Sequence, residues 1–264
     1  MKENKAKSLI DIAFNELIES IEKGQSEVLK NYMKTMGRFH NYSFTNIMLI
    51  SMQFPTATRV AGFHTWRKLD RYIMKGEKGI KIIAPIIRKK EEVQKEIVNS
   101  EHDICGFRIV TVFDISQTNG KELPAISTVE GDPKEYCSKL NELIFKQNIQ
   151  LEYSDDIAAE GYSSGGKIVI KSGLSLAEDF SVRVHEFAHE FLHQNKNGKL
   201  SKKQKETEAE AVAFVVSSAI GLDANTAFSD YIQMYQGDKE TLMNSIQRIK
   251  EVSSRILEGL GCSG

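Results

Sequence analysis

Residues 175–193 read SLAEDFSVRVHEFAHEFLH, and this stretch decides how the second half of the chain is organised. Ser175 and Glu178 have the spacing of a capping box, which predicts that a helix begins here. The apolar residues that follow recur at helical spacing. His185 and His189 are therefore expected one turn apart on one face of a helix.

The motif His185-Glu186-x-x-His189 contains the residue types of a metal site that activates water. Two imidazoles at i and i+4 can ligate one ion, and the glutamate between them lies next to a metal-bound water. A zinc site of this kind needs a third protein ligand and an open fourth position. We expect His185 and His189 as ligands of Zn²⁺, or of Mn²⁺ or Co²⁺ in its place, and Glu186 as the catalytic general base.

The third ligand is expected from a second helix, which begins at the capping box of residues 201–204 and runs to Gly221. Glu206 and Glu210 share one face of that helix. We predict that Glu206 is the third metal ligand and that Glu210 is the acceptor that orients a histidine. Spacing alone leaves the reverse assignment open. His193 is not expected as a ligand, because eight residues along a helix span about 12 Å.

Residues 167–170 read KIVI and predict a strand just before the histidine helix. An edge strand beside a metal site can bind an extended peptide through backbone hydrogen bonds. The same residues fit an ordinary strand inside a sheet equally well. Both interpretations stay open at this stage.

The composition is that of a globular protein, with 264 residues, 41% of them hydrophobic and 27% charged. This length suffices for one large or two modest domains. The three cysteines are widely spaced, which argues against a disulfide framework and against a cysteine zinc site. Residues 1–5 do not begin a signal peptide, and no apolar run approaches 18 residues. We therefore expect a cytoplasmic protein without a membrane partner.

Charge divides the chain into two halves. Residues 1–125 carry a net charge of +5, and residues 126–264 carry −6. Residues 55–90 hold 10 basic and 2 acidic residues, which indicates a polyanionic partner. The polar stretch 116–132 predicts a boundary, giving domains 1–125 and 126–264.

The expected elements mix helices and short strands, which predicts an α+β fold. Helices are predicted over 6–30, 40–52, 134–148 and 239–260, besides the two described above. Strands are predicted over 58–61, 80–87 and 107–115, and a strand pair over 162–170.

The basic segment of residues 55–90 also contains the only tryptophan of the chain, Trp66. Aromatic rings can stack on bases while cations follow the phosphates of a single strand. Packing of Trp66 in the core beneath a solubilising basic surface is the alternative. The residues assigned to nucleic acid in this segment are Arg59, Phe63, Trp66, Lys75, Lys78 and Lys81.

Four motifs of the first half resemble the N-terminal, single-stranded-DNA-binding domain of ArdC-type antirestriction proteins. They are Asn46-x-x-Leu49-Ile50, Arg59-Val60-Ala61-Gly62-Phe63-x-Thr65-Trp66, Lys75-Gly76-Glu77-Lys78-Gly79-Ile80 and Phe113-Asp114-x-x-Gln117-Thr118. The H-E-x-x-H motif and the later E-x-x-A-E resemble the zincin-like metallopeptidase domain of the same family. The resemblance implies an N-terminal α+β domain that binds single-stranded DNA, with Asn46 among its contacts, followed by a gluzincin-like domain. It also implies a protein of a plasmid, phage or other mobile genetic element that protects incoming single-stranded DNA.

Two classes of function stay open. The first is a zinc-dependent metallopeptidase that its DNA-binding domain delivers to protein or peptide substrates. The second is a non-catalytic protein that protects single-stranded DNA and whose metal domain is structural. Glu186 favours the first class, because a purely structural zinc site has no use for a base beside the metal. The sequence does not identify a protein substrate.

Overall fold

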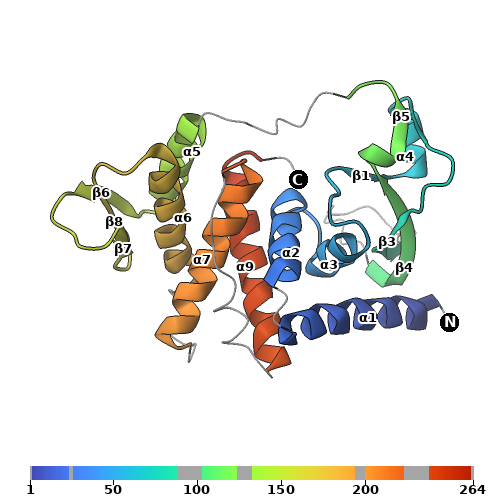
Figure 1. The fold of residues 1–264 in the computed structure, drawn as a ribbon, viewed down its shortest axis with the longest axis horizontal. Helices are drawn as coiled ribbons and strands as arrows, with labels where there is room; N and C mark the ends of the chain where they lie inside the picture. The colour runs from blue at the N-terminus through green and yellow to red at the C-terminus, as the bar shows by residue number, and fades with distance from the viewer. Residues whose placement is uncertain are drawn as a thin grey trace, which may run out of the picture. The chain divides into compact units, whose positions relative to one another are not determined.

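The computed structural model describes residues 2–23, 26–88, 103–123, 133–193, 200–222 and 238–262, and every structural statement below refers to these. The chain forms two compact units (Figure 1). The first unit is Met1–Leu17 with Thr45–Leu123, and the second is Ile18–Phe44 with Pro124–Gly264. The later boundary lies two residues before the one expected from the sequence, whereas Ile18–Phe44 joins the second unit.

The first unit contains a helical part and a small antiparallel sheet. Its helices are α1 (Lys2–Glu22, which continues into the second unit), α3 (Phe44–Gln53) and α4 (Phe63–Lys68). One sheet has the order β1 (Val60–Gly62), β4 (Asp103–Asp114), β3 (Ile80–Arg88), and β2 (Arg71–Ile73) pairs separately with β5 (Thr118–Gly120). Its core residues include Ile47, Leu49, Ile50, Trp66, Ile80, Ile82 and Val112.

Two amide side chains of α3 cover the outer edge of β3. The Asn46 amide donates to the Ile83 carbonyl and accepts from the Ile83 N–H, both at 2.8 Å. Gln53 makes the same pair of bonds with the backbone of Lys81, both at 2.9 Å. An edge strand otherwise presents unpaired backbone groups that invite pairing with another chain. Asn46 therefore has a structural role in fixing α3 against the sheet, and the contact with DNA expected of it stays a prediction.

The second unit is built around α7 (Lys202–Ala219), which packs against α2 (Ser26–Arg38), α6 (Leu176–His193) and α9 (Lys239–Gly259). Nearly every residue of α7 from Thr207 to Ser217 is buried, as expected for a helix with neighbours on several sides. The buried carboxylate of Glu208 accepts from the guanidinium of Arg248 and so ties α7 to α9. At Gly37 an added Cβ would lie 2.9 Å from the Val215 carbonyl oxygen, so α2 approaches α7 closely.

A three-stranded sheet and α5 (Pro133–Lys146) lie next to α6 in the same unit. The strand order is β6 (Gln150–Ser154), β8 (Lys167–Lys171), β7 (Gly161–Ser163). β6 runs parallel to β8, and β7 runs antiparallel to it. Because β8 is paired on both sides, the interpretation of residues 167–170 as a substrate-binding edge is wrong. The edge strand nearest α6 is β7.

These elements confirm the predicted α+β fold. The predicted helix over residues 6–30 consists of two helices, α1 and α2. Within the described ranges, no helix is both long and apolar enough to cross a membrane.

Candidate functional site

Both predicted capping boxes are present, and they fix where the two site helices begin. At the start of α6, the Ser175 N–H donates to Glu178 at 3.0 Å and the Glu178 N–H donates to Ser175 Oγ at 3.4 Å. At the start of α7, Ser201 and Gln204 make the same reciprocal pair at 2.8 and 3.2 Å. Each box satisfies backbone N–H groups that have no partner inside the helix.

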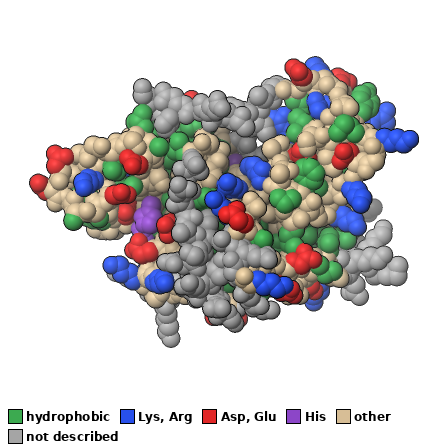
Figure 2. All heavy atoms as spheres, in the orientation of Figure 1, with side chains coloured by type: hydrophobic (Ala, Val, Ile, Leu, Met, Phe, Trp, Pro, Cys, Tyr) green, Lys and Arg blue, Asp and Glu red, His purple; other side chains and the backbone are tan. Residues whose placement is uncertain are grey.

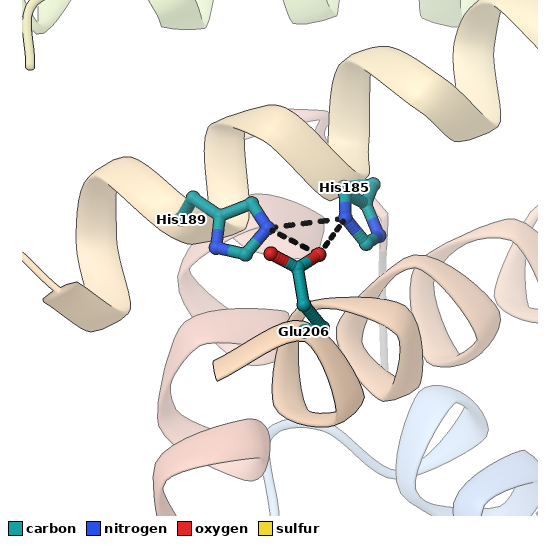
Figure 3. A group of neighbouring side chains, drawn as sticks. All are labelled: His185, His189 and Glu206. Carbon is teal, nitrogen blue, oxygen red and sulfur yellow. Dashed lines mark hydrogen bonds and ion pairs between the residues drawn. The ribbon is translucent and has the colours of Figure 1, made fainter. Parts of the chain in front are cut away.

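The structure brings His185 and His189 of α6 together with Glu206 of α7 (Figure 3). The Nε2 atoms of the two histidines lie 3.1 Å apart. Glu206 Oε2 lies 3.5 Å from His185 Nε2 and 3.4 Å from His189 Nε2. Ligand atoms around a tetrahedral zinc ion with bonds of about 2.0–2.1 Å are about 3.3 Å apart. The three side chains therefore fit one divalent ion without rearrangement.

Burial keeps both histidines in the form that binds metal. It lowers the pKa of His185, and the Glu206 carboxylate opposes this shift. The pKa of His189 is also lowered by burial, and the neighbouring His185 adds to the effect. A neutral imidazole has the lone pair that a metal ion needs.

Glu186 lies in a buried and negatively charged environment. Burial, followed by the charges of Glu206 and Glu190, raises the pKa of Glu186 to about 7, while a hydrogen bond from the Ser163 N–H acts in the opposite direction. A cation bound at the neighbouring cluster would also favour the carboxylate. A carboxyl group with such a pKa can both accept and return a proton near neutral pH.

Glu210 lies on the same face of α7 as Glu206, and both line one cavity together with His185. Its side chain is exposed. The role of Glu210 in orienting a histidine stays a prediction. The structure does not describe the side chain of His193, so the expectation that it is not a ligand stays a prediction.

Glu190 contributes to the site, although the sequence motif did not indicate it. Its side chain is 3% exposed, and its two oxygens accept from the N–H groups of Gly165 and Gly166 at 2.9 and 2.8 Å. Both glycines have positive φ, 69° and 89°, which lets consecutive N–H groups converge on one anion. Glu190 therefore holds the β7–β8 turn against α6.

The backbone of β7 lies directly beside Glu186. An added Cβ at Gly161 would lie 2.8 Å from Val182 Cγ1 and 3.1 Å from Glu186 Cγ, so only glycine allows this approach. Backbone hydrogen bonds flank β7 at both ends: the Ser164 N–H donates to the Lys167 carbonyl, and the Lys171 N–H donates to the Glu160 carbonyl. Because antiparallel pairing alternates, the backbone groups of Gly161 and Ser163 point away from β8.

Two cavities flank the cluster, and Figure 2 shows histidine atoms at the surface beside acidic side chains. The first cavity has a volume of about 570 Å³ and lies between α6 and α7. The second, of about 800 Å³, is lined by β7, α6 and the start of α7. An extended peptide that occupied both cavities would pass Glu186 and the cluster of His185, His189 and Glu206.

In the first unit, most of the cations assigned to nucleic acid are accessible. Lys75, Lys78 and Lys81 are exposed and Arg59 is half-buried. The ring of Phe63 is 46% exposed, and the guanidinium of Arg67 lies 5.8 Å from its centre. This surface can offer positive charge and one aromatic ring to a ligand.

Trp66 does not belong to that surface. Its side chain is fully buried, and its indole N–H donates to the Phe113 carbonyl at 2.9 Å. The expectation that a base stacks on Trp66 is therefore wrong, because the ring faces the core of the unit. Phe63 and Tyr72 of the same segment are exposed, at 46% and 57%.

Comparison with known proteins relates this chain to ArdC antirestriction proteins. Residues 7–113 match the family described as the N-terminal domain of anti-restriction factor ArdC. The crystal structure of the metal-free antirestriction ArdC protein from the R388 plasmid is similar over 96% of this chain and 97% of that one, with a TM-score of 0.58 and 16% identity. Its Mn(II)-bound structure gives a TM-score of 0.55 at 15% identity, over 95% and 97% of the two chains.

Residues 7–113 therefore match the N-terminal domain of the ArdC family, as the resemblance of their motifs implied, and the fold of the whole chain is similar to that of the R388 ArdC protein. The low identity to the two crystal structures means that they establish the fold alone. A protein of Bacillus anthracis, the uncharacterized protein pXO2-81, is 28% identical over 269 residues. That alignment covers 84% of this chain and 46% of the relative, so this chain spans less than half of the length of the Bacillus anthracis protein.

Proposed function

We propose that this protein is an antirestriction protein of a mobile genetic element, acting in the cytoplasm, in which a single-stranded-DNA-binding unit accompanies a zinc-dependent peptidase centre. The observation that carries the proposal is the meeting of His185, His189 and Glu206 at distances that suit one ion, with Glu186 beside them. A structural zinc site would gain nothing from this base.

The donor set supports a catalytic ion. Two imidazoles and one carboxylate leave a position open on a four-coordinate metal. When bound there, a zinc ion would polarise the substrate carbonyl and acidify a water molecule. The Mn(II) in the R388 ArdC structure was bound by that protein, and it supports a divalent cation as the cofactor here.

Residues of this chain supply the remaining functions. Glu186 accepts the proton of the attacking water and passes it to the leaving amine. The outward-facing backbone groups of Gly161 and the Ser163 carbonyl bind an extended peptide by adding a strand to β7, while the Ser163 N–H stays with Glu186. Glu190 keeps β7 in place through the two glycines of the turn.

The first unit supports binding of single-stranded DNA through its cations and the exposed ring of Phe63. The cations proposed to contact phosphates are Arg59, Lys75, Lys78 and Lys81, with Arg67 added by its position over Phe63. Stacking of a base is assigned to Phe63 in place of Trp66. A nearly neutral protein with such a basic segment can attract a polyanion locally.

Incubation with cell extract tests this proposal. Zinc-loaded wild-type protein and the Glu186→Ala variant are incubated with extract, with and without single-stranded DNA, and cleaved products are identified by mass spectrometry. Wild type should produce new peptide ends and Glu186→Ala should not. Products in neither sample, with zinc bound in both, would favour the non-catalytic protection protein.

A further inference from the structure

The first cavity at the metal cluster, here called the α6–α7 cavity, continues well past the ligands. Its 570 Å³ lies within the range of about 300–1,000 Å³ common for ligand pockets. His185 and Glu206 line it, and so do Ala177 near the start of α6 and Ser217 near the end of α7. A side chain that entered it would belong to a residue next to the bond under attack.

The lining of the α6–α7 cavity is strongly acidic. Among the described residues that line it, five are glutamates and none is lysine or arginine. The glutamates are Glu160, Glu178, Glu186, Glu206 and Glu210. A divalent ion would offset the charges of Glu186 and Glu206, and Glu160, Glu178 and Glu210 carry the other negative charges of the lining.

Ser217 provides an independent indication of a ligand. It is 1% exposed, and its Oγ has no hydrogen-bond partner within the described part of the protein. A buried hydroxyl without a partner is costly unless a ligand or water satisfies it. Gly161, Ala177 and Ala213, which line the same cavity as Ser217, have small side chains and leave room for a ligand.

The second cavity differs in charge from the first. It is lined by Lys202 and Lys205 in addition to Glu186, Glu190 and Glu206. The two cavities would therefore prefer different substrate side chains. An acidic substrate side chain would meet like charges in the α6–α7 cavity, and such a contact is unfavourable in a partly enclosed site.

Building on the proposed peptidase function, we propose that the α6–α7 cavity binds the lysine or arginine side chain of a peptide at a position flanking the cleaved bond. The ammonium or guanidinium group pairs with the carboxylates and donates to Ser217 Oγ. The aliphatic stem fills the space left by the small residues. The enzyme would thereby select basic sequences and reject acidic ones at this position.

A peptide library tests the preference. Zinc-loaded protein is incubated with a proteome-derived library, and cleavage sites are read by mass spectrometry. We expect lysine and arginine to be enriched at least about fivefold at one position next to the cleaved bond, with aspartate and glutamate depleted there. Cleavage with no basic preference would overturn the cavity assignment and leave the peptidase function standing.

A charge reversal provides the matched control. Glu160→Lys changes an exposed residue at the cavity and should lower kcat/KM for the best basic peptide about 5- to 10-fold. Glu142→Lys makes the same charge change on the exposed side of α5 and should leave kcat/KM unchanged. Equal effects of the two variants would contradict a local interaction.

A binding measurement separates the cavity from catalysis. Blocked single residues, Nα-acetyl-lysine methylamide and its arginine, norleucine and glutamate counterparts, are titrated into the full chain with and without zinc. The methyl resonances of Ala177 and Ala213 should shift with the two basic probes and not with the others. Binding of the basic probes without any peptide cleavage would contradict the peptidase function alone. Equal shifts with norleucine, or no shift with any probe, would overturn the assignment of the cavity to a basic side chain.

Discussion

The carboxylate of Glu206 links the two helices of the metal centre. Its Oε2 lies 3.5 and 3.4 Å from the Nε2 atoms of His185 and His189, as an oxygen ligand of the same ion should. Glu210 lies one turn farther along α7 and lines the same cavity. The geometry therefore favours Glu206 as the ligand, an assignment that spacing alone left open.

Zinc affinity distinguishes the two glutamates. Glu206→Ala should lower the affinity by more than about 100-fold, because it removes one of three protein ligands. Glu210→Ala should lower it by about 10- to 100-fold or less, as is typical when an orienting partner is lost. Competition titration with a zinc chelator measures both, and a larger loss in Glu210→Ala would reverse the assignment.

Single residues of the basic segment also have separable roles. Phe63 is exposed and Trp66 is buried, so of these two rings Phe63 is the one that can stack on a base. Phe63→Ala should weaken binding of single-stranded DNA by about 1–3 kcal/mol while circular dichroism stays unchanged. Trp66→Ala should instead destabilise the fold by about 3–5 kcal/mol, because it leaves a large cavity. Unchanged DNA affinity in Phe63→Ala would remove the stacking assignment.

The lysines of the turn before β3 should contribute charge only. Lys75→Ala and Lys78→Ala should weaken binding for every DNA sequence alike, because phosphate contacts carry no sequence information. Each should flatten the dependence of log K on log salt concentration by about 0.7, the value for one phosphate of a single strand. Titrations of the full chain at several salt concentrations measure this slope. Glu77→Ala is the neighbouring control and should not flatten it.

Helices α6 and α7 were predictable from the sequence because their signals are local. A capping box spans four residues, and apolar spacing marks the buried face within a few turns. The strand arrangement was not predictable in this way, since the parallel pairing of β6 with β8 and the edge position of β7 depend on residues far apart in the chain. For the same reason the sequence did not indicate that Glu190 binds the turn at Gly165.

The β7–β8 hairpin depends on Glu190, and this dependence can be measured as stability. Glu190→Ala leaves the N–H groups of Gly165 and Gly166 without their carboxylate, which should cost about 1.5–3 kcal/mol in the free energy of unfolding. Urea denaturation measures this, with the exposed Glu142→Ala as the control that should change it by less than about 0.5 kcal/mol. A Glu190→Ala variant as stable as wild type would show that the turn does not need the carboxylate.

The whole chain combines two compact units of opposite net charge. The basic segment lies in the first unit and the metal ligands lie in the second. Charge counting predicted domains 1–125 and 126–264 and did not indicate that Ile18–Phe44 joins the second unit. That placement follows from the packing of α2 against α7, which brings Gly37 next to Val215 across a long sequence separation.

The most direct test of the metal centre is zinc K-edge absorption spectroscopy on the full chain loaded with one equivalent of zinc. We predict one ion per chain with two imidazole nitrogens at about 2.0–2.1 Å and the remaining ligands oxygen. The His185→Ala/His189→Ala double variant should hold no stoichiometric zinc, and Glu186→Ala should give the wild-type spectrum. Sulfur ligands at about 2.3 Å, or full retention of zinc by the double variant, would contradict the account.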